Sequence, residues 1–392
     1  MNELHRVLVV GGGYAGVMAA LRASRRLGRA GEVTLVSERP ELTERIRLHE
    51  VAARGADARR PLEALLRGSR VRVEVARVDA IDVAAKTASS AERAWAYDKL
   101  IVAVGSRADL SLPGAAAHAH CLDGARVGAL RAALDACADG ASVVVIGGGL
   151  TGVECASELA EARPSLRVTL VTSGAVGAGL DARAAEHLRR VLARLGVAVR
   201  EGARVERVEP TGVRLAGGEE VPAEVTVCAT GFVASDALAR WGFEVDARGR
   251  ARVDAALRAR GAPDVYVAGD CAAPEGAVGS PVPLGCKSAM PLGVIAAENA
   301  VASLKGRPER AVDWMEVVYC LSLGRRDGVV QAMRADGSPG DTFVTGALAA
   351  FTKELICKGT VAVIPLERDG WFEYRYRRAP GRALATAAPE VA

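Results

Sequence analysis

Short runs of apolar residues alternate with stretches of helical character along the first half of the chain. Residues 7–10 (V-L-V-V) and 143–146 (V-V-V-I) are continuously apolar, as expected for parallel strands that are buried on both faces. Each run leads through a glycine-rich turn into a helical stretch and then into a second strand, V-T-L-V, at residues 33–36 and 168–171. The order strand, turn, helix, strand predicts two βαβ units and therefore an α/β fold with parallel sheets.

Both turns have the glycine spacing G-x-G-x-x-G, at residues 11–16 and 147–152. In this motif the first glycine permits a tight turn, the second lets the backbone approach a pyrophosphate, and the third lets helix and strand pack closely. The helix N-terminus adds free N–H groups for the phosphates. A single motif is weak evidence, but two complete copies predict two dinucleotides. The expected loop residues are Gly11, Gly13, Tyr14, Ala15 and Gly16 in the first copy and Gly147, Gly149, Leu150, Thr151 and Gly152 in the second.

The two copies differ where a ribose would bind. Ser37 and Glu38 follow the strand of the first copy, and the carboxylate of Glu38 suits a ribose diol. Thr172 and Ser173 stand at the aligned positions of the second copy, which therefore lacks the acidic residue that favours an unphosphorylated ribose. NADH and NADPH both remain candidates for the second loop. No arginine follows immediately to bind a 2′-phosphate, which slightly favours NADH.

Composition narrows the class of protein. The net charge of +4 is too small to indicate nucleic acid as the main partner, and an aromatic content of 4% makes stacked base-binding platforms improbable. No apolar run approaches the roughly 18 residues of a membrane-spanning helix. The eight cysteines include no C-x-x-C pair, so we expect no metal site and read them as buried thiols in a reducing cytoplasm.

Three further motifs carry a resemblance to a known family. They are Y-D-K-L-I-V-A-V-G-S at residues 97–106, V-T-V-C-A-T-G-F at 225–232 and D-V-Y-V-A-G-D at 264–270. Together with the two glycine loops, they resemble the pyridine nucleotide-disulfide oxidoreductase superfamily over residues 7–270. The resemblance implies two nested Rossmann-like domains, with FAD on the first loop and NADH or NADPH on the second. It also implies that Ala103, Val104, Gly105, Gly269 and Asp270 bind FAD, with Asp270 on the ribityl chain, and that Thr230 and Gly231 bind NAD(P)H.

The disulfide reductases of this superfamily carry a cysteine pair after the first loop, but residues 14–60 contain no cysteine. The chain is therefore more similar to the FAD-containing type II NADH dehydrogenases and their soluble relatives. That similarity continues through residues 44–50 and 286–291. The second segment departs from the A-Q-x-A-x-Q signature of the membrane-bound enzymes, because Lys287 and Pro291 replace its glutamines. This departure counts against quinone as the acceptor.

Two residues are candidates for a direct role in the chemistry. Reduced flavin is anionic near N1, so we expect a helix that begins close to Pro291, with Lys287 and the backbone of Ala289 and Met290, to face the pyrimidine end of FAD. A surface position for Lys287 is an equal alternative. Glu154 is placed in the first helical turn after the second loop. The resemblance puts it at the nicotinamide, which we favour over simple stabilisation of the helix.

A polar cluster follows the second strand of the first copy. It consists of Arg45, Arg47, His49 and Glu50, and the resemblance takes its segment past the isoalloxazine, with Arg45 among the FAD-binding residues. A solvated loop face is the alternative for this cluster.

The expected domains are a discontinuous FAD domain (1–113 and 256–310), an NAD(P)H domain nested within it (114–255) and a C-terminal α+β region (311–392). In relatives such a region covers the flavin and arranges dimers or the acceptor site. The basic run at 375–378 fits a solvated edge better than an anionic membrane surface, and the tail at 379–392 does not read as an amphipathic membrane helix. Contact with a membrane is therefore not favoured.

The leading functional hypothesis is an FAD-dependent oxidoreductase that passes hydride from NAD(P)H to FAD and on to a quinone-like or other small-molecule acceptor. One alternative is a tailoring flavoenzyme that acts on a specific metabolite, with its nicotinamide site partly disused. A second alternative is a redox-sensing flavoprotein that responds to nucleotides.

Overall fold

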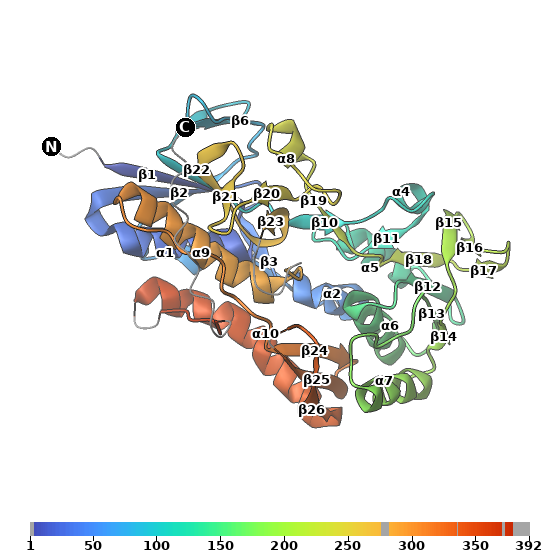
Figure 1. The fold of residues 1–392 in the computed structure, drawn as a ribbon. Helices are drawn as coiled ribbons and strands as arrows, with labels where there is room; N and C mark the ends of the chain where they lie inside the picture. The colour runs from blue at the N-terminus through green and yellow to red at the C-terminus, as the bar shows by residue number, and fades with distance from the viewer. Residues whose placement is uncertain (1–3, 276–281, 335, 371–372, 379–392) are drawn as a thin grey trace.

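A computed structural model describes residues 4–275, 282–334, 336–370 and 373–378. It has two lobes, the first built on a largely parallel sheet and the second on a fully parallel one, and a C-terminal region that lies against both (Figure 1). Two nested Rossmann-like units with an added α+β region are the fold class that the sequence predicts. Within the described ranges, no helix is long and apolar enough to cross a membrane.

The first lobe contains an eight-stranded sheet in which β1 is an interior strand, and its apolar residues 7–10 are buried, as their sequence predicts. β1 pairs in parallel with β2 on one side and with β9 on the other. In sheet order the strands are β23 (Ala272–Pro274), β20 (Ala251–Val253), β21 (Arg258–Ala259), β22 (Ala262–Val267), β9 (Lys99–Val102), β1 (His5–Val10), β2 (Gly31–Ser37) and β5 (Val71–Val75). The helices of this lobe are α1 (Tyr14–Leu27), α3 (Leu62–Leu66), α8 (Ala237–Arg240) and α9 (Cys286–Leu304). Helix α2 (Leu48–Arg54) follows from the same stretch of chain, but its buried residues lie in the core of the second lobe.

Two smaller sheets also belong to this lobe. They pair β3 (Glu41–Thr43) with β4 (Arg59–Pro61), and β6 (Ala80–Asp82) with β7 (Thr87–Ser89) and β8 (Ala94–Ala96). The chain crosses between the lobes on a two-stranded ribbon of β10 (Ser106–Ala108) and β19 (Phe232–Ala234). Short 3-10 turns occupy Gly28–Ala30, Arg45–Arg47 and Gly269–Cys271.

The second lobe repeats the arrangement of the first, since β12 pairs in parallel with β13 and β18. Its sheet runs β11 (His120–Cys121), β18 (Val225–Cys228), β12 (Ser142–Ile146), β13 (Arg167–Val171) and β14 (Ala198–Arg200). Its helices are α4 (Ala115–His118), α5 (Val127–Asp135), α6 (Leu150–Ala162) and α7 (Ala182–Arg194). A separate meander contains β15 (Val205–Glu209), β16 (Gly212–Leu215) and β17 (Glu220–Pro222).

The packing places one domain boundary earlier than the sequence expectation of about residue 256. Strand β20 lies in the first lobe's sheet, and Leu238, Trp241 and Phe243 lie in the same core as β1. The reason is that β19 already returns the chain to the first lobe. Gly261 lies in the turn between β21 and β22, and Ala262 and Pro263 begin β22. Residues 234–255 therefore pack with the first lobe.

The C-terminal region joins the two lobes. It contains the antiparallel strands β24 (Val318–Leu323), β25 (Asp327–Met333) and β26 (Pro339–Thr345), followed by the long helix α10 (Gly346–Asp369). Leu321 and Val329 lie in the core of the second lobe, whereas Ile364 lies in the core of the first. In Figure 1 the strands lie beside α7, and α10 extends from them below the first lobe.

The end of the chain is only partly described. Arg378 pairs with Asp313 at 3.3 Å, and the hydroxyl of Tyr376 donates to the same carboxylate at 2.7 Å. The expectation about the tail at 379–392 lies outside the described residues.

Helices α1 and α9 cross at a point where only glycine fits. A Cβ built on Gly293 of α9 would lie 2.2 Å from the carbonyl oxygen of Ala15 on α1. The crossing therefore holds the N-terminus of α1, and with it the first glycine loop, against α9.

The variant Gly293→Ala should push these helices apart and destabilise the fold by about 1–3 kcal/mol, the usual cost of overpacking. Gly128→Ala is a matched control, because a Cβ on this α5 residue would meet nothing within 4 Å. The control should stabilise the protein by about 0.5–1 kcal/mol, since it replaces glycine inside a helix. Urea and thermal unfolding measure both effects, and equal midpoints for the two variants would contradict the crossing.

Candidate functional site

The first glycine loop has the shape that a dinucleotide pyrophosphate requires. Gly11 has φ +116°, and a Cβ there would lie 2.3 Å from the carbonyl oxygen of Ala103. A Cβ on Gly16 would lie 1.8 Å from the carbonyl oxygen of Gly11, whereas one on Gly13 would meet nothing within 4 Å. Two glycines thus bring the backbone into close contact, and the third leaves open space in front of the N-terminus of α1. The residues present fit a bound FAD.

The second loop reproduces this geometry. Gly147 has φ +117°, and its Cβ would lie 2.4 Å from the carbonyl oxygen of Ala229. A Cβ on Gly152 would lie 1.9 Å from the carbonyl oxygen of Gly147, and one on Gly149 would meet nothing within 4 Å. This loop borders a cavity of about 390 Å³ that also contacts Leu150, Thr151, Thr172, Ser173, Thr230 and Gly231. Of the residues predicted for NAD(P)H, all except Gly152 and Glu154 border this cavity.

The ribose ends of the two loops correspond residue by residue. Buried Ser37 stands against Gly12, whose Cβ would lie 2.5 Å from the Ser37 hydroxyl oxygen. Thr172 stands in the same way against Gly148, at 2.7 Å. The next residues, Glu38 and Ser173, are both exposed. In the described part of the chain Glu38 has no hydrogen-bond partner, so its carboxylate is available to a ribose.

The expected flavin end gathers segments that are far apart in the sequence. The two carboxylate oxygens of Asp270 accept hydrogen bonds from Gly285 N at 2.8 Å and from the Ser106 hydroxyl at 2.7 Å. Arg45 donates to the carbonyl oxygen of Ser106 at 2.7 Å, and its guanidinium lies 4.8 Å from the centre of the Phe232 ring. The structure thus brings Arg45 and Asp270 together beside the turn formed by residues 103–105.

The start of α9 corrects the sequence expectation. The helix begins at Cys286, and Pro291 lies inside it rather than at its start. The N–H group of Ala289 donates to the carbonyl oxygen of Gly285 at 2.9 Å, so it is not free to face a flavin. Met290 is also buried within the helix. The free N–H groups of this helix end therefore belong to residues before Ala289.

Lys287 is not a free cation. Its ammonium pairs with the carboxylate of Glu316 and lies 5.5 Å from the centre of the Tyr319 ring. Tyr319 in turn borders a cavity of about 230 Å³ together with Gly149, Leu150 and Leu321. Lys287 thus contacts the C-terminal region near the second loop, and its charge is balanced there.

Glu154 lies in the second turn of α6, because the helix begins at Leu150; the expectation of the first turn is wrong. Its carboxylate is buried and contacts the C-terminal region. It accepts hydrogen bonds from Ser322 N at 2.9 Å and from the Ser322 hydroxyl at 3.2 Å, and pairs with Lys353 at 3.1 Å. The Lys353 ammonium also donates to the carbonyl oxygen of Cys320 at 3.3 Å.

This pair is fully charged at neutral pH. Burial opposes both charges, but Lys353 holds the pKa of Glu154 below its ordinary value, and Glu154 raises the pKa of Lys353. Sequence reasoning missed Lys353, which comes from α10. The available signal was that charges interrupt the otherwise apolar stretch at residues 346–365.

A cavity of about 670 Å³ lies beside the pair. It is called here the acceptor cavity, after the role that we propose for it. Its lining includes Lys353, Ser322, His49, Glu50 and Phe351. His49 is buried, which lowers the pKa of its imidazole. Arg47 pairs with Glu354 of α10 at 3.0 Å. The solvated-face alternative for residues 45–50 is therefore wrong, since this segment packs against α10.

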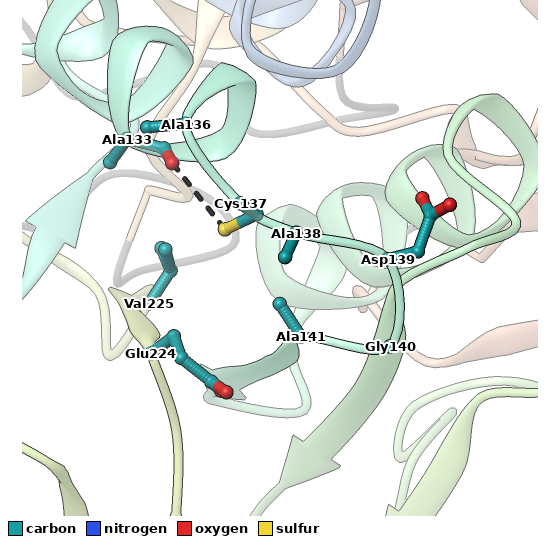
Figure 2. A pocket seen from close by; sticks show the side chains of 9 residues that line it. All are labelled: Ala133, Ala136, Cys137, Ala138, Asp139, Gly140, Ala141, Glu224 and Val225. Atoms are coloured by element: carbon teal, nitrogen blue, oxygen red, sulfur yellow. Dashed lines mark hydrogen bonds between the residues drawn. The ribbon is translucent and has the colours of Figure 1, made fainter.

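The hollow in Figure 2 does not belong to this site. It has a volume of about 390 Å³ and is lined by Cys137, Ala141, Glu224 and Val225 among others. Ala141 precedes β12 and Val225 begins β18, so the hollow lies at the amino ends of the strands. Ligands of open α/β sheets bind beyond the carboxyl ends, where the glycine loops are.

Comparison with known proteins agrees with this geometry. The family model described as pyridine nucleotide-disulphide oxidoreductase matches residues 5–303. The chain belongs to this family. It is 33% identical to an NADH dehydrogenase-like protein of Mycobacterium tuberculosis, over 90% of this chain and 92% of that protein. It is 26% identical to the type II NADH:quinone oxidoreductase of Staphylococcus aureus, over 91% and 94% of the two chains.

Solved structures show the same fold. The sulfide:quinone oxidoreductase of Aquifex aeolicus superposes with a TM-score of 0.79 at 20% identity, covering 93% of this chain and 92% of that one. NDH2 of Plasmodium falciparum in complex with NADH gives 0.73 at 12% identity, covering 94% and 99%. The protein is thus an NAD(P)H-dependent flavin oxidoreductase of the type II NADH dehydrogenase-like branch, as the sequence predicts.

The role expected for Glu38 can be tested through the affinity for FAD. Glu38→Ala removes an unpaired acceptor at the end of β2 and should cost about 1.5–3 kcal/mol of FAD binding, the usual range for a charged hydrogen bond. Glu63→Ala removes another exposed carboxylate of the same lobe and should leave the affinity unchanged. Titration of the apoprotein, followed by flavin fluorescence, measures both. An unchanged affinity in Glu38→Ala would remove Glu38 from the site.

The Glu154 and Lys353 pair predicts a pH dependence of stability. Because the pKa of Glu154 is lowered on folding, its stabilising effect is present above the unfolded value of about 4.3 and is lost as the pH falls through the folded value. Glu154→Gln should therefore destabilise the protein by about 3 kcal/mol at pH 7, and by progressively less below pH ~4. Thermal unfolding between pH 3 and 8 measures this, with Glu219→Gln as the exposed control. A constant difference across this range would contradict the prediction.

Proposed function

We propose that the protein is an NAD(P)H dehydrogenase that passes electrons to a quinone-like small molecule in the acceptor cavity. The observation that carries the proposal is the buried Glu154 and Lys353 pair, whose lysine lines that cavity. FAD held along residues 11–16 would supply the two-electron chemistry between a nicotinamide held along residues 147–152 and the acceptor.

The acceptor side needs a fixed positive charge. Two-electron reduction of a quinone places negative charge on its oxygens, and a fixed cation in a dry site stabilises such charge strongly. The Lys353 ammonium is such a cation, because Glu154 and the carbonyl oxygen of Cys320 hold it at the wall of the cavity. Its protonated Nζ can donate a hydrogen bond to an acceptor oxygen.

The surface of α10 supports an apolar acceptor. Leu348, Phe351 and Leu355 are 61%, 61% and 53% exposed, and Phe351 also lines the acceptor cavity. Their spacing puts them on one side of the helix. An apolar molecule can therefore approach along side chains of its own polarity before it meets the charged pair.

The departure from the A-Q-x-A-x-Q signature at Lys287 and Pro291 is weaker evidence against a quinone acceptor than the sequence alone suggests. Lys287 is occupied by Glu316, and Pro291 is buried within α9, so neither residue lines the acceptor cavity. The names of two similar proteins, the type II NADH:quinone oxidoreductase and the sulfide:quinone oxidoreductase, also point to a quinone.

Lys353→Met tests the proposal. The variant should slow acceptor-dependent turnover by about 100-fold, as the loss of a preorganised charge does elsewhere. Anaerobic bleaching of the flavin by NADH or NADPH should change no more than a few-fold, because the donor binds along the other loop. Stopped-flow absorbance separates the two half-reactions, and a soluble quinone analogue serves as the acceptor.

Lys358→Met is the matched control, since Lys358 lies on the same helix, is exposed and pairs with Glu354 at 3.5 Å. It should leave both half-reactions unchanged. If Lys353→Met slowed flavin bleaching as much as acceptor reduction, Lys353 would not act at the acceptor. No bleaching of the unmodified protein by either nucleotide would overturn the proposal and favour the metabolite-specific flavoenzyme.

A further inference from the structure

The adenosine end of the second dinucleotide cavity has an arginine in its wall. Beyond the glycine loop, the cavity is bordered by Thr172, Ser173 and Arg204. Arg204 lies between β14 and β15, far along the chain from the loop. In the sequence, no arginine directly follows the second strand, which slightly favours NADH. In the folded protein, however, Arg204 does border the cavity.

The first lobe contains the matching position for comparison. The N–H group of Ala76 donates to the carbonyl oxygen of Ser37 at 2.9 Å, and that of Ala203 donates to Thr172 at 2.9 Å. Arg77 and Arg204 are the next residues, so they occupy equivalent places in the two lobes. In the first lobe Arg77 lies 3.7 Å from the carboxylate of Asp79, and Glu38 provides an acid for the ribose.

The second lobe lacks both of these acids. Ser173 stands where Glu38 stands, and among the described residues Arg204 forms no ion pair. The nearby carboxylate of Glu201 accepts from Val176 N at 2.7 Å and from Arg189 at 3.3 Å. Glu219 is paired with Arg200 at 2.6 Å. Exposed Glu206 forms no ion pair with Arg204 in the described chain.

We propose that this wall binds the 2′-phosphate of an adenine dinucleotide, so that NADPH is preferred to NADH as the hydride donor. The inference deepens the proposed function, on which it rests, by naming the donor. A guanidinium presents several N–H groups to phosphate oxygens in a fork, and the hydroxyl groups of Thr172 and Ser173 add neutral partners. The cavity wall contains no carboxylate that would repel the phosphate dianion.

The test compares two fragments that differ only by the 2′-phosphate. The FAD-loaded protein is titrated calorimetrically with adenosine 2′,5′-bisphosphate and with 5′-AMP at fixed ionic strength. The bisphosphate should bind at least tenfold more tightly, and added salt should weaken its binding more than that of 5′-AMP. Equal affinities for the two fragments would overturn the proposal.

Two variants identify the residues responsible. Arg204→Ala should remove most of the tenfold difference. Arg207→Ala should not, because Arg207 is an exposed arginine of β15, three residues further along the chain, that does not border the cavity. Ser173→Glu should reverse the preference by placing an acid opposite the ribose. If Arg204→Ala bound both fragments as the unmodified protein does, the assignment to Arg204 would be wrong.

The fragment titration keeps this inference distinct from the acceptor proposal. A preference for the bisphosphate together with no reduction of any quinone would support the donor assignment and overturn the acceptor assignment. Quinone reduction with equal kcat/KM for NADPH and NADH, together with equal fragment affinities, would support the acceptor assignment and overturn the donor assignment.

Discussion

The buried ion pair between Glu154 and Lys353 holds the C-terminal region against the second lobe. It joins α6 to α10, and its carboxylate also receives the Ser322 N–H group of β24. Removing one partner of a buried pair commonly costs about 3–5 kcal/mol, because the other charge stays buried without compensation. The far end of α10 is tied to the first lobe by Arg22 and Glu367 at 2.7 Å. One helix therefore sets the acceptor cavity against both lobes.

The two lobes show how one local design serves two ligands. Their glycines make the same close contacts, and Ser37 and Thr172 stand in the same relation to the loops. These features follow from backbone geometry, which any dinucleotide pyrophosphate demands. The two lobes differ one residue further on, where Glu38 corresponds to Ser173. They also differ at Arg77, which lies beside Asp79, and at Arg204, which borders the second cavity. Under the proposed donor preference, ligand choice depends on a few exposed side chains on a shared scaffold.

The sequence predicts the parts of this protein that local rules decide. The glycine loops, the strands on either side of them and the nested order follow from short motifs whose residues are adjacent in the chain. The start of α9 is misjudged because proline favours the first turn of a helix, yet Pro291 lies further inside. Lys353 and Arg204 escape prediction for another reason: only the tertiary fold brings them to Glu154 and to Ser173.

Strand β24 separates the two cavities of the proposed reaction. Successive side chains of a strand point to opposite faces. Tyr319 and Leu321 border the cavity beside the second glycine loop, whereas the Ser322 hydroxyl contacts Glu154 and lines the acceptor cavity. A donor and an acceptor can therefore bind on different sides of β24. Because a shift of one residue would exchange the two sets of side chains, the pairing of β24 with β25 fixes this separation.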